Sequence, residues 1–328
     1  MRSRIRGARV VAALAVLLLV ASSAGAARAE EPYPVRPVEI IVPFSAGGGT
    51  DLIARLLCDG LTRRLGQTFV ALNRAGANTN LGTQVAVRAR PDGYSLLMAS
   101  IGLTANPALY RRLPFDPRTD LAPISLIANS STVVVVNPSV PVHTIEELIA
   151  YLKARPGEVN YASYGVGSGP HLAAEQFQAA TGTRLVHVPF SGGGQAAVAV
   201  LSNHVEMMFS GPLPVLAMIR SGTLRPIGVA AEQRLPLLPD VPTFKEHGID
   251  YRSGTWFGLL APAHTPEPVI ATLHAATVET FKEPGVREKL VDQGAEIITN
   301  SPGEFRQFIA EESDRLTTII RKASIHID

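Results

Sequence analysis

Cysteine is almost absent from the chain, which has one among 328 residues. A single thiol, Cys58, cannot form an intrachain disulfide, so the fold must be stabilised by burial of apolar side chains. The content of 46% apolar and 18% charged residues is typical of a globular protein and excludes a disordered one. Cys58 lies in an apolar helical pattern, which favours a small buried side chain over a reactive nucleophile.

The apolar run near the N-terminus is too short to span a bilayer. Val10 to Val20 has 11 residues, whereas a spanning helix needs about 20. Four arginines precede this run, and Ala27-Arg28-Ala29 supplies small residues at the spacing of a cleavage site. The pattern predicts a secretory signal peptide over residues 1–29, cleaved after Ala29, and therefore a periplasmic protein. A retained membrane anchor is the alternative, whereas lipid attachment is excluded because no cysteine stands at the cleavage point.

Excess positive charge is also lacking once the signal peptide is removed. The full chain has 30 basic and 28 acidic residues, and residues 1–29 hold five arginines and no acid, so the mature chain has a formal net charge of about −3. No basic run occurs later in the sequence. Nucleic acid is therefore not an expected partner.

Motifs of nucleotide chemistry are incomplete. The glycine run that ends at Asp51 lacks the Lys-Ser/Thr pair that a P-loop uses to hold phosphates and magnesium. The segment Gly165-Val166-Gly167-Ser168-Gly169 has the wrong third-glycine spacing for a dinucleotide loop, and no acid follows about 20 residues later. We therefore expect no cofactor.

Catalytic and metal-binding constellations are incomplete as well. Ser168 is not in a Gly-x-Ser-x-Gly motif, because Val166 occupies the place of the first glycine. A serine nucleophile still stays open as an alternative, since His171 is close in sequence. His171 and Glu175 could share a metal but lack a third ligand nearby, and we favour a His171 that holds the adjacent glycine loop. We expect no catalytic residue and no metal site.

What the chain does have is a pair of glycine-rich loops, each between a β-branched strand and an apolar helix. They are Ile40 to Asp51 (IIVPFSAGGGTD) and Val186 to Gln195 (VHVPFSGGGQ). Glycines leave backbone N–H groups unscreened at a helix N-terminus, where the helix dipole places about half a positive charge. Such positions attract anions. A tight turn without ligand would explain either loop alone, but the repetition favours two similar domains that direct their loops into one cleft.

Strand and helix patterns alternate along most of the chain, which predicts parallel sheets with right-handed crossovers. Capping-box spacing marks two helix starts, at Thr144 and at Ser301. The apolar stretch Ile124 to Asn137 is predicted to carry the chain into a second domain, and Ser253 to Ala261 to carry it back, which implies a hinge. After Glu267 we expect only helices, packed on the first domain. The predicted domains are residues 30–131 with 256–328, and residues 132–255.

Further motifs are spread through nearly the whole mature chain. They are Asn73-Arg74-x-Gly76-Ala77, Pro91-Asp92-Gly93-Tyr94, Asn106-Pro107-x-Leu109-Tyr110, the Ser163 to Leu172 segment, Asp240-Val241-Pro242-Thr243 and Gln293-Gly294-Ala295. With the two glycine loops, they resemble the periplasmic solute-binding proteins of tripartite tricarboxylate transporters, the Bug-type receptors. Ala75 stands where this family usually has a proline, and Asn78-Thr79 replaces a glycine pair, so the contact of that loop with ligand departs from the family pattern.

The resemblance implies an α/β, two-lobed periplasmic-binding-protein fold (type II, Venus-flytrap), in which each lobe is a mostly parallel sheet flanked by helices. The lobes would close around a small organic acid, held by backbone amides and bridging water. The predicted ligand-binding residues are Phe44, Ser45, Ala46, Gly47, Gly48, Gly49, Thr50, Asp51, Ser168, Gly169, Phe190, Ser191, Gly192 and Gly193.

The resemblance also implies that the chain is not an enzyme. We expect a monomer that delivers its ligand to the small and large membrane subunits of a tripartite tricarboxylate transporter. Two alternatives stay open: an exported enzyme that uses Ser168 or Asp51 on a carboxylate, and a ligand sensor for a membrane signalling protein. Asp51 is unusual beside an anion, and we expect it to brace its loop or to contact an ammonium or hydroxyl group of the ligand.

The signal peptide gives a first test. Expression of the full chain in a Gram-negative host should yield a periplasmic product whose N-terminal residue is Glu30. N-terminal sequencing and intact mass measure this outcome. A periplasmic product that retains residues 1–29 would instead support the membrane anchor.

Overall fold

The computed structural model describes residues 32–190 and 192–327, and residues from Arg36 onward form one compact unit. The predicted signal peptide and Ser191 lie outside the described residues. In the part that is described, no helix combines the length and apolar character needed to cross a bilayer.

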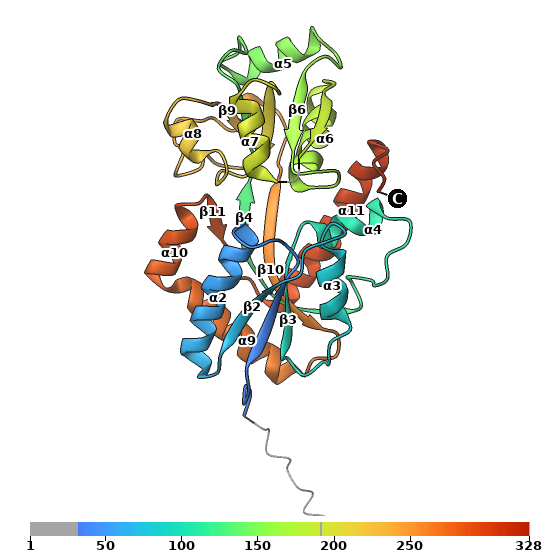
Figure 1. Ribbon diagram of the computed structural model, residues 1–328, viewed down its shortest axis with the longest axis vertical. Coiled ribbons are helices and arrows are strands. Elements are labelled where there is room, and N and C mark those ends of the chain that lie inside the picture. The colour runs from blue at the N-terminus through green and yellow to red at the C-terminus, as the bar shows by residue number, and fades with distance from the viewer. Residues whose placement is uncertain (1–31, 191, 328) are drawn as a thin grey trace, which may run out of the picture. The chain divides into compact units, whose positions relative to one another are not determined.

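The first of two sheets has six strands in the order β11-β4-β10-β3-β1-β2. Strands β1 (Val38–Val42), β2 (Phe69–Asn73) and β3 (Ser95–Ser100) are parallel. Strand β10 (Gly254–Pro262) runs antiparallel to β3 and to β4 (Leu121–Ser131), and β11 (Ala295–Ile297) runs antiparallel to β4. Figure 1 shows the long strands β4 and β10 side by side.

The second sheet has five strands in the order β7-β6-β8-β5-β9. Its parallel members are β6 (Asn160–Ser163), β7 (Val186–Pro189) and β8 (Met207–Ser210). Strand β5 (Val133–Val136) is antiparallel to β8 and to β9 (Arg225–Val229). Each sheet thus combines parallel strands that alternate with helices and antiparallel strands near the crossings, which confirms the predicted α/β class.

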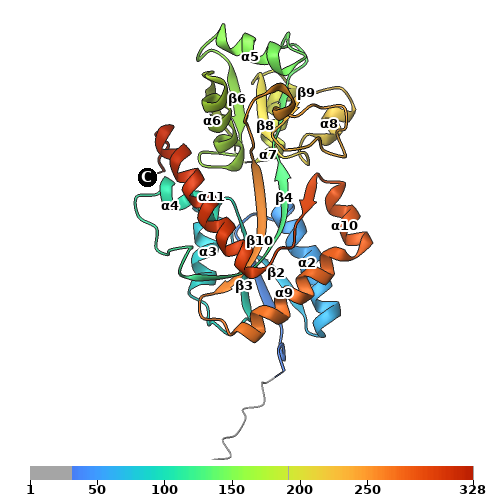
Figure 2. The same cartoon turned by 180° about the vertical axis from the view of Figure 1, so that it is seen from behind.

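Helices cover both faces of each sheet. Around the six-stranded sheet they are α2 (Gly49–Leu65), α3 (Asn80–Val87), α4 (Gly102–Leu109), α9 (Glu267–Lys282), α10 (Pro284–Val291) and α11 (Pro302–Lys322). Around the five-stranded sheet they are α5 (Ile145–Lys153), α6 (Gly169–Thr181), α7 (Gly193–Leu201), α8 (Leu216–Arg220) and the short 3₁₀ helix η1 (Lys245–His247). Figure 2 shows α11 beside α4, against which it packs.

The side-chain alternation of β5 separates two cores. Val134 and Val136 pack with α5 and α6, whereas Val133 and Val135 pack with α7 and α8. Because successive strand residues point to opposite faces, a run of four valines is buried on both sides. In the six-stranded sheet a third core lies under α3, α4 and α11. Cys58 is buried in α2, and burial raises the pKa of its thiol to about 12, as expected for a structural side chain.

The predicted helix starts are confirmed in detail. The Thr144 hydroxyl accepts the N–H of Glu147, and Ser301 and Glu304 form a reciprocal capping box. The expectation of only helices after Glu267 is wrong at one place, because β11 adds an edge strand to β4. The stretch Ile124 to Asn137, predicted as a crossing, is divided at Thr132 between β4 of one sheet and β5 of the other.

The two sheets are joined where three segments meet at Thr132. Thr132 N–H donates to Ser253 O at 2.8 Å, and Ala230 N–H donates to Thr132 O at 2.8 Å. Ser253 N–H in turn donates to Ala230 O at 3.1 Å. The chain therefore leaves the six-stranded sheet and returns to it at hydrogen-bonded neighbours. The exact domain boundaries given above stay a prediction.

A glycine in β10 tests the packing of α11. A Cβ at Gly258 would lie 2.2 Å from Cζ of Phe305, which is fully buried. Gly258→Ala should lower the free energy of unfolding by about 1–3 kcal/mol, because Phe305 has no room to move away. Urea denaturation measures the loss. The matched control is Gly285→Ala in α10, where nothing lies within 4 Å of the added Cβ. Equal stability of the two variants would contradict this packing.

Candidate functional site

The carboxyl ends of the parallel strands in both sheets face the junction at Thr132. In the six-stranded sheet, Ser100 at the end of β3 pairs with Phe257 near the start of β10. In the five-stranded sheet, Ser210 at the end of β8 pairs with Val133 at the start of β5. Since Val133 follows Thr132 directly and β10 begins just after Ser253, the loops that leave these strand ends flank the junction. Ligands of open α/β sheets bind at such carboxyl edges.

The first glycine loop connects β1 to α2. Phe44 is half-buried, residues 45–48 are exposed, and Gly47 has the positive φ of +87° that makes glycine favourable there. Helix α2 begins at Gly49, with Gly48 as an extended N-cap. Among the described residues, none accepts a hydrogen bond from the N–H groups of Gly48, Gly49 or Thr50. These donors remain available to an anion.

Asp51 braces this loop from inside. Its carboxylate accepts Gly47 N–H at 2.9 Å, Asn73 Nδ2 at 2.9 Å and Arg55 Nε at 2.9 Å. Asn73 also donates to Phe44 O at 3.0 Å, so the start and the end of the loop are tied together. The arrangement favours the bracing role over contact with ligand, because both carboxylate oxygens are engaged.

The ionisation of Asp51 follows from these bonds. Burial by itself raises the pKa of Asp51, but the hydrogen bonds from Arg55, Gly47 and Asn73 outweigh it, and the pKa lies below the ordinary value of 3.8. The side chain is therefore an anion at neutral pH and is already neutralised by Arg55.

The second glycine loop connects β7 to α7. Phe190 is half-buried, and its N–H donates to Ser163 O at 3.0 Å. Ser191 lies outside the described residues. Helix α7 begins at Gly193, where an added Cβ would lie 3.1 Å from Tyr164 Cζ. The loop therefore packs closely on the segment that follows β6.

That segment, Tyr164 to Ser168, leads into α6 and forms a third helix start at the junction. Ser168 Oγ donates to Gly165 O at 2.7 Å, and Gly167 N–H donates to His171 Nδ1 at 3.0 Å. His171 thus holds the glycine loop and is not bonded to Ser168, which leaves the alternative of a serine nucleophile without its base. Helix α6 begins at Gly169, with Ser168 as an extended N-cap.

The first residues of α2 and α6 both lie next to strand β10. An added Cβ at Gly49 would lie 3.8 Å from Phe257 Cζ, and one at Gly169 would lie 4.0 Å from Thr255 Cβ. Thr255 and Phe257 are two residues apart and share one face of the strand. Gly193 joins the group through Tyr164, and Phe190 O lies 3.7 Å from a Cβ built on Gly165. Gly49 and Gly169 therefore begin helices beside one short segment of β10, and Gly193 begins a helix against Tyr164, five residues before Gly169.

Several polar residues of this region were not predicted from the sequence. Thr255 Oγ1 and Ser100 Oγ are 2.9 Å apart, and Tyr164 donates to or accepts from Ser210 Oγ at 2.6 Å. A hydroxyl at alternate positions of an otherwise apolar strand, as in Ser253-Gly-Thr255, is the sequence signal that identifies Thr255. Ser100 and Ser210 share the feature that each is the last residue of its strand.

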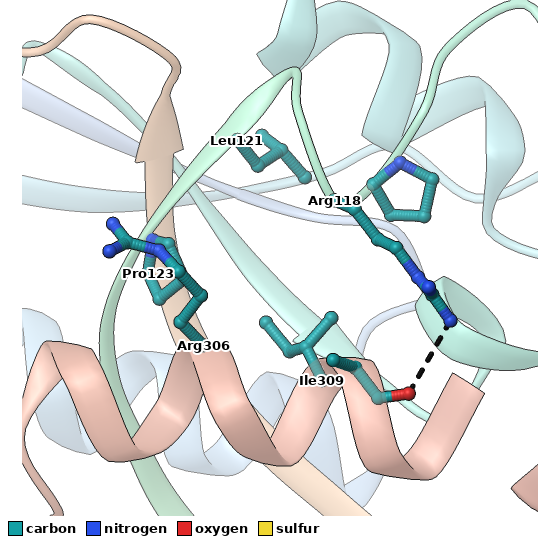
Figure 3. Close-up of a pocket in the computed structure, with 7 residues that line it drawn as sticks. Arg118, Leu121, Pro123, Arg306 and Ile309 are labelled. Atoms are coloured by element: carbon teal, nitrogen blue, oxygen red, sulfur yellow. Dashed lines mark hydrogen bonds between the residues drawn. The ribbon is translucent and has the colours of Figure 1, made fainter. Parts of the chain in front are cut away.

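Other features of the described residues carry no comparable chemistry. No group of three or more His, Cys, Asp or Glu side chains is placed to hold a metal ion in the described ranges. A hollow of about 60 Å³ lies between α11 and the start of β4, lined by Arg118, Arg306, Leu121 and Ile309 with neighbouring residues (Figure 3). None of its lining residues belongs to the glycine loops.

Two helix-flanked sheets, joined by paired crossings and with glycine-rich helix starts at the junction, define the class of periplasmic solute-binding proteins. Residues 53–325 match the family described as "Tripartite tricarboxylate transporter family receptor". The chain belongs to this family of solute receptors.

Individual receptors of this kind are also similar to the chain over most of its length. The chain is 35% identical to protein BugT of Bordetella pertussis, over 96% of this chain and 97% of BugT. The structure of periplasmic binding protein BugD matches with a TM-score of 0.80 at 32% identity, covering 90% of this chain and all of that one. An R. palustris protein with adipate (TM-score 0.82, 30% identity, 90% and 100% covered) and MatC of Rhodopseudomonas palustris with bound malate (0.79, 31%, 88% and 100%) are also similar.

The brace at Asp51 gives a test of stability. Asp51→Asn removes charge-assisted hydrogen bonds and turns an amide N–H₂ toward existing donors, so it should lower the free energy of unfolding by about 1.5–3 kcal/mol at pH 7. Because the pKa of Asp51 is lowered in the folded chain, the stabilisation is present above about pH 4 and is lost as the pH falls through the folded pKa. Urea denaturation at pH 7 and at low pH measures both effects.

The control is Asp59→Asn, an exposed carboxylate on the same helix, which should change stability by no more than about 0.5 kcal/mol. If Asp51→Asn were as stable as this control at pH 7, the brace would have no energetic role.

Proposed function

We propose that the chain is a periplasmic receptor that captures a small carboxylate between the loops of its two sheets. The observation that supports this most is the placement of the starts of α2 and α6 beside Phe257 and Thr255, with the start of α7 against Tyr164. Within the described residues, the N–H groups of Gly48, Gly49 and Thr50 at the start of α2 have no acceptor. Each helix start contributes partial positive charge to the same region. The predicted residues from Phe44 to Asp51, Ser168, Gly169 and Phe190 to Gly193 form its ligand site.

The proposed mode of recognition uses neutral donors. None of the three loops, residues 43–51, 164–169 and 190–195, contains a lysine or arginine. Backbone amides at helix ends can bind a carboxylate by charge-assisted hydrogen bonds without burying a second full charge. Thr255 and Ser100 add hydroxyl groups that can donate to the ligand or to a bridging water.

The ligands of related proteins indicate the class of ligand. Adipate and malate are both short dicarboxylates, and both occur in relatives that align with nearly all of this chain. We therefore propose an aliphatic dicarboxylate, with one carboxylate on the amides of α2 and the other end of the molecule near α6 and α7. Phe44 and Phe190 would form apolar walls on either side.

Capture and delivery would use the junction at Thr132. Hinge closure about two neighbouring crossings brings the loops of the two sheets together around the ligand. The closed receptor, exported by its signal peptide as a monomer, would then dock on the small and large membrane subunits of a tripartite tricarboxylate transporter. The proposal includes no enzymatic step.

A screen of mono-, di- and tricarboxylates by thermal shift tests the function. A ligand present at 100 times its dissociation constant adds about 2.7 kcal/mol to stability, which is readily detected. Adipate or malate should raise the melting temperature, the corresponding diamides should not, and calorimetry should give one ligand per chain with no product formed. Turnover of the acid would identify an enzyme, and the absence of any stabilising acid would contradict the receptor.

The site itself is tested by Thr255→Val. This nearly isosteric change removes the hydroxyl group and should weaken dicarboxylate binding about 10- to 150-fold, as expected for loss of one hydrogen bond to a charged group. The control is Thr272→Val on α9, whose hydroxyl donates only to Pro268 O within its own helix. Equal affinities of the two variants would place the ligand elsewhere.

A further inference from the structure

Two histidine rings, one from α6 and one from β7, stack on each other next to the loop that leads into α6. The rings of His171 in α6 and His187 in β7 lie 4.0 Å apart and only 7° from parallel. Tyr161 in β6 stacks on the other side of His187 at 5.0 Å. His171 is 6% exposed, so it has little contact with solvent. Neither histidine belongs to the predicted ligand-binding residues.

The hydrogen bond of His171 defines its protonation state. Nδ1 accepts the N–H of Gly167 at 3.0 Å, and a ring nitrogen that accepts a hydrogen bond carries no proton. The ring must therefore be neutral, with its proton on Nε2. Uptake of a second proton would place an N–H group opposite the N–H of Gly167, and the loop would have to move away.

The loop that depends on this bond contacts both sheets. A Cβ at Gly167, whose φ is +75°, would lie 2.7 Å from Leu109 Cδ1, so the segment packs tightly against α4. The next two residues are Ser168 and Gly169, which form the start of α6 in the proposed ligand site. On the other side of the loop, Ser163 Oγ accepts Gly165 N–H at 3.0 Å and lies 2.5 Å from His187 Nε2. Both histidines are thus connected to the same short segment.

The charged neighbours do not stabilise a protonated His171. On its own helix, Glu175 Oε1 lies 3.8 Å from Nε2, too far for a hydrogen bond. Burial raises the pKa of Glu175, despite hydrogen bonds from Gln178 and Tyr161, so this carboxylate is neutralised by acid more readily than an ordinary glutamate. From α11, Arg315 reaches α6 one turn further on, where it donates to Gln176 Oε1 at 2.7 Å and pairs with Glu312. From β7, His187 would repel an imidazolium.

We propose that His171 is a positioning residue of the ligand site: its neutral ring holds the N–H of Gly167, and protonation of the ring releases the loop Gly165–Gly169 and weakens ligand binding. The proposal rests on the function proposed above and adds a dependence on external pH. Ligand would be held at neutral pH and released as the surroundings become acidic.

The direction of the pH dependence follows from the two states of the loop, bonded to His171 or released from it. Burial, with a further contribution from the charge of His187, lowers the pKa of His171 to about 3 in the bonded loop, against an ordinary value of 6.5 that the ring regains when the loop is released. The released loop therefore binds more protons between about pH 6.5 and 3, and the bonded loop is increasingly disfavoured as the pH falls through this range. The loop bond competes with the proton, so the ligand-free chain takes up the proton at a pKa between these two values, and binding weakens about tenfold for each pH unit below that pKa.

The decisive variant is His171→Asn. Asparagine places Oδ1 near the position of Nδ1, so it still accepts the N–H of Gly167, but it does not titrate. Calorimetry with adipate and with malate at pH 7.5 and 4.5 should show that acid weakens binding to the native chain more than it weakens binding to His171→Asn, by about tenfold for each pH unit below the pKa of His171 in the ligand-free chain. The titration of the ligand itself is common to both proteins and cancels in this ratio. His187→Gln, which retains a nitrogen near Ser163, should keep the pH dependence of the native chain.

An equal pH dependence in the native chain and in His171→Asn would overturn the proposal. So would an unchanged affinity at both pH values for His171→Ala, which cannot accept the bond at all. If neither acid binds, the receptor function itself has failed, and the role of His171 is then tested without ligand. In that case NMR titration of the histidine rings should show a pKa of His171 well below 6.5, and the exchange of the Gly167 amide should accelerate in acid in the native chain but not in His171→Asn.

Discussion

The arrangement of this protein depends on three backbone hydrogen bonds at Thr132. They join the end of β4, the segment after β9 and the start of β10, so that both connections between the sheets pass through one point. Since the parallel strands of each sheet direct their carboxyl ends toward this point, the loops of the proposed ligand site lie in the same region. In the part of the chain that the structure describes, hydrogen bonds between backbone groups bring these loops together.

In the proposed site, the groups that would bind the anion are distinct from the charged side chains that stabilise the loop. The donors that would meet an anion are backbone amides and hydroxyl groups, whereas the full charges nearby, Asp51 and Arg55, neutralise each other behind the first loop. A carboxylate next to an anion site is unfavourable only if it faces the ligand. The Asp51 carboxylate faces Gly47 and Asn73, and so it holds the loop in place without repelling the ligand.

Much of this could be predicted from the sequence, because its signals are local. Strand, glycine loop and helix follow one another within about a dozen residues at Ile40 and again at Val186, and capping boxes at Thr144 and Ser301 define helix starts. The strand β11 was missed because it has three residues and pairs with β4, more than 160 positions earlier. Thr255 was missed for a similar reason: its importance comes from the antiparallel placement of β10 between loops that lie far away in sequence. The hydrogen bond from Gly167 to His171 could be predicted in part. The four-residue spacing in the sequence indicated that His171 holds the loop, but it did not indicate which ring nitrogen accepts the bond.

The double crossing at Thr132 has a consequence for evolution. Residues 133–252 leave and rejoin the remainder of the chain at adjacent backbone positions, so an exchange of this whole segment between two relatives would create only two new joints, both in the same small area. The half of the binding surface that carries α6 and α7 could thus be inherited separately from the half that carries α2. Recombination at this point offers a route to new ligand preferences that needs no stepwise change within either sheet.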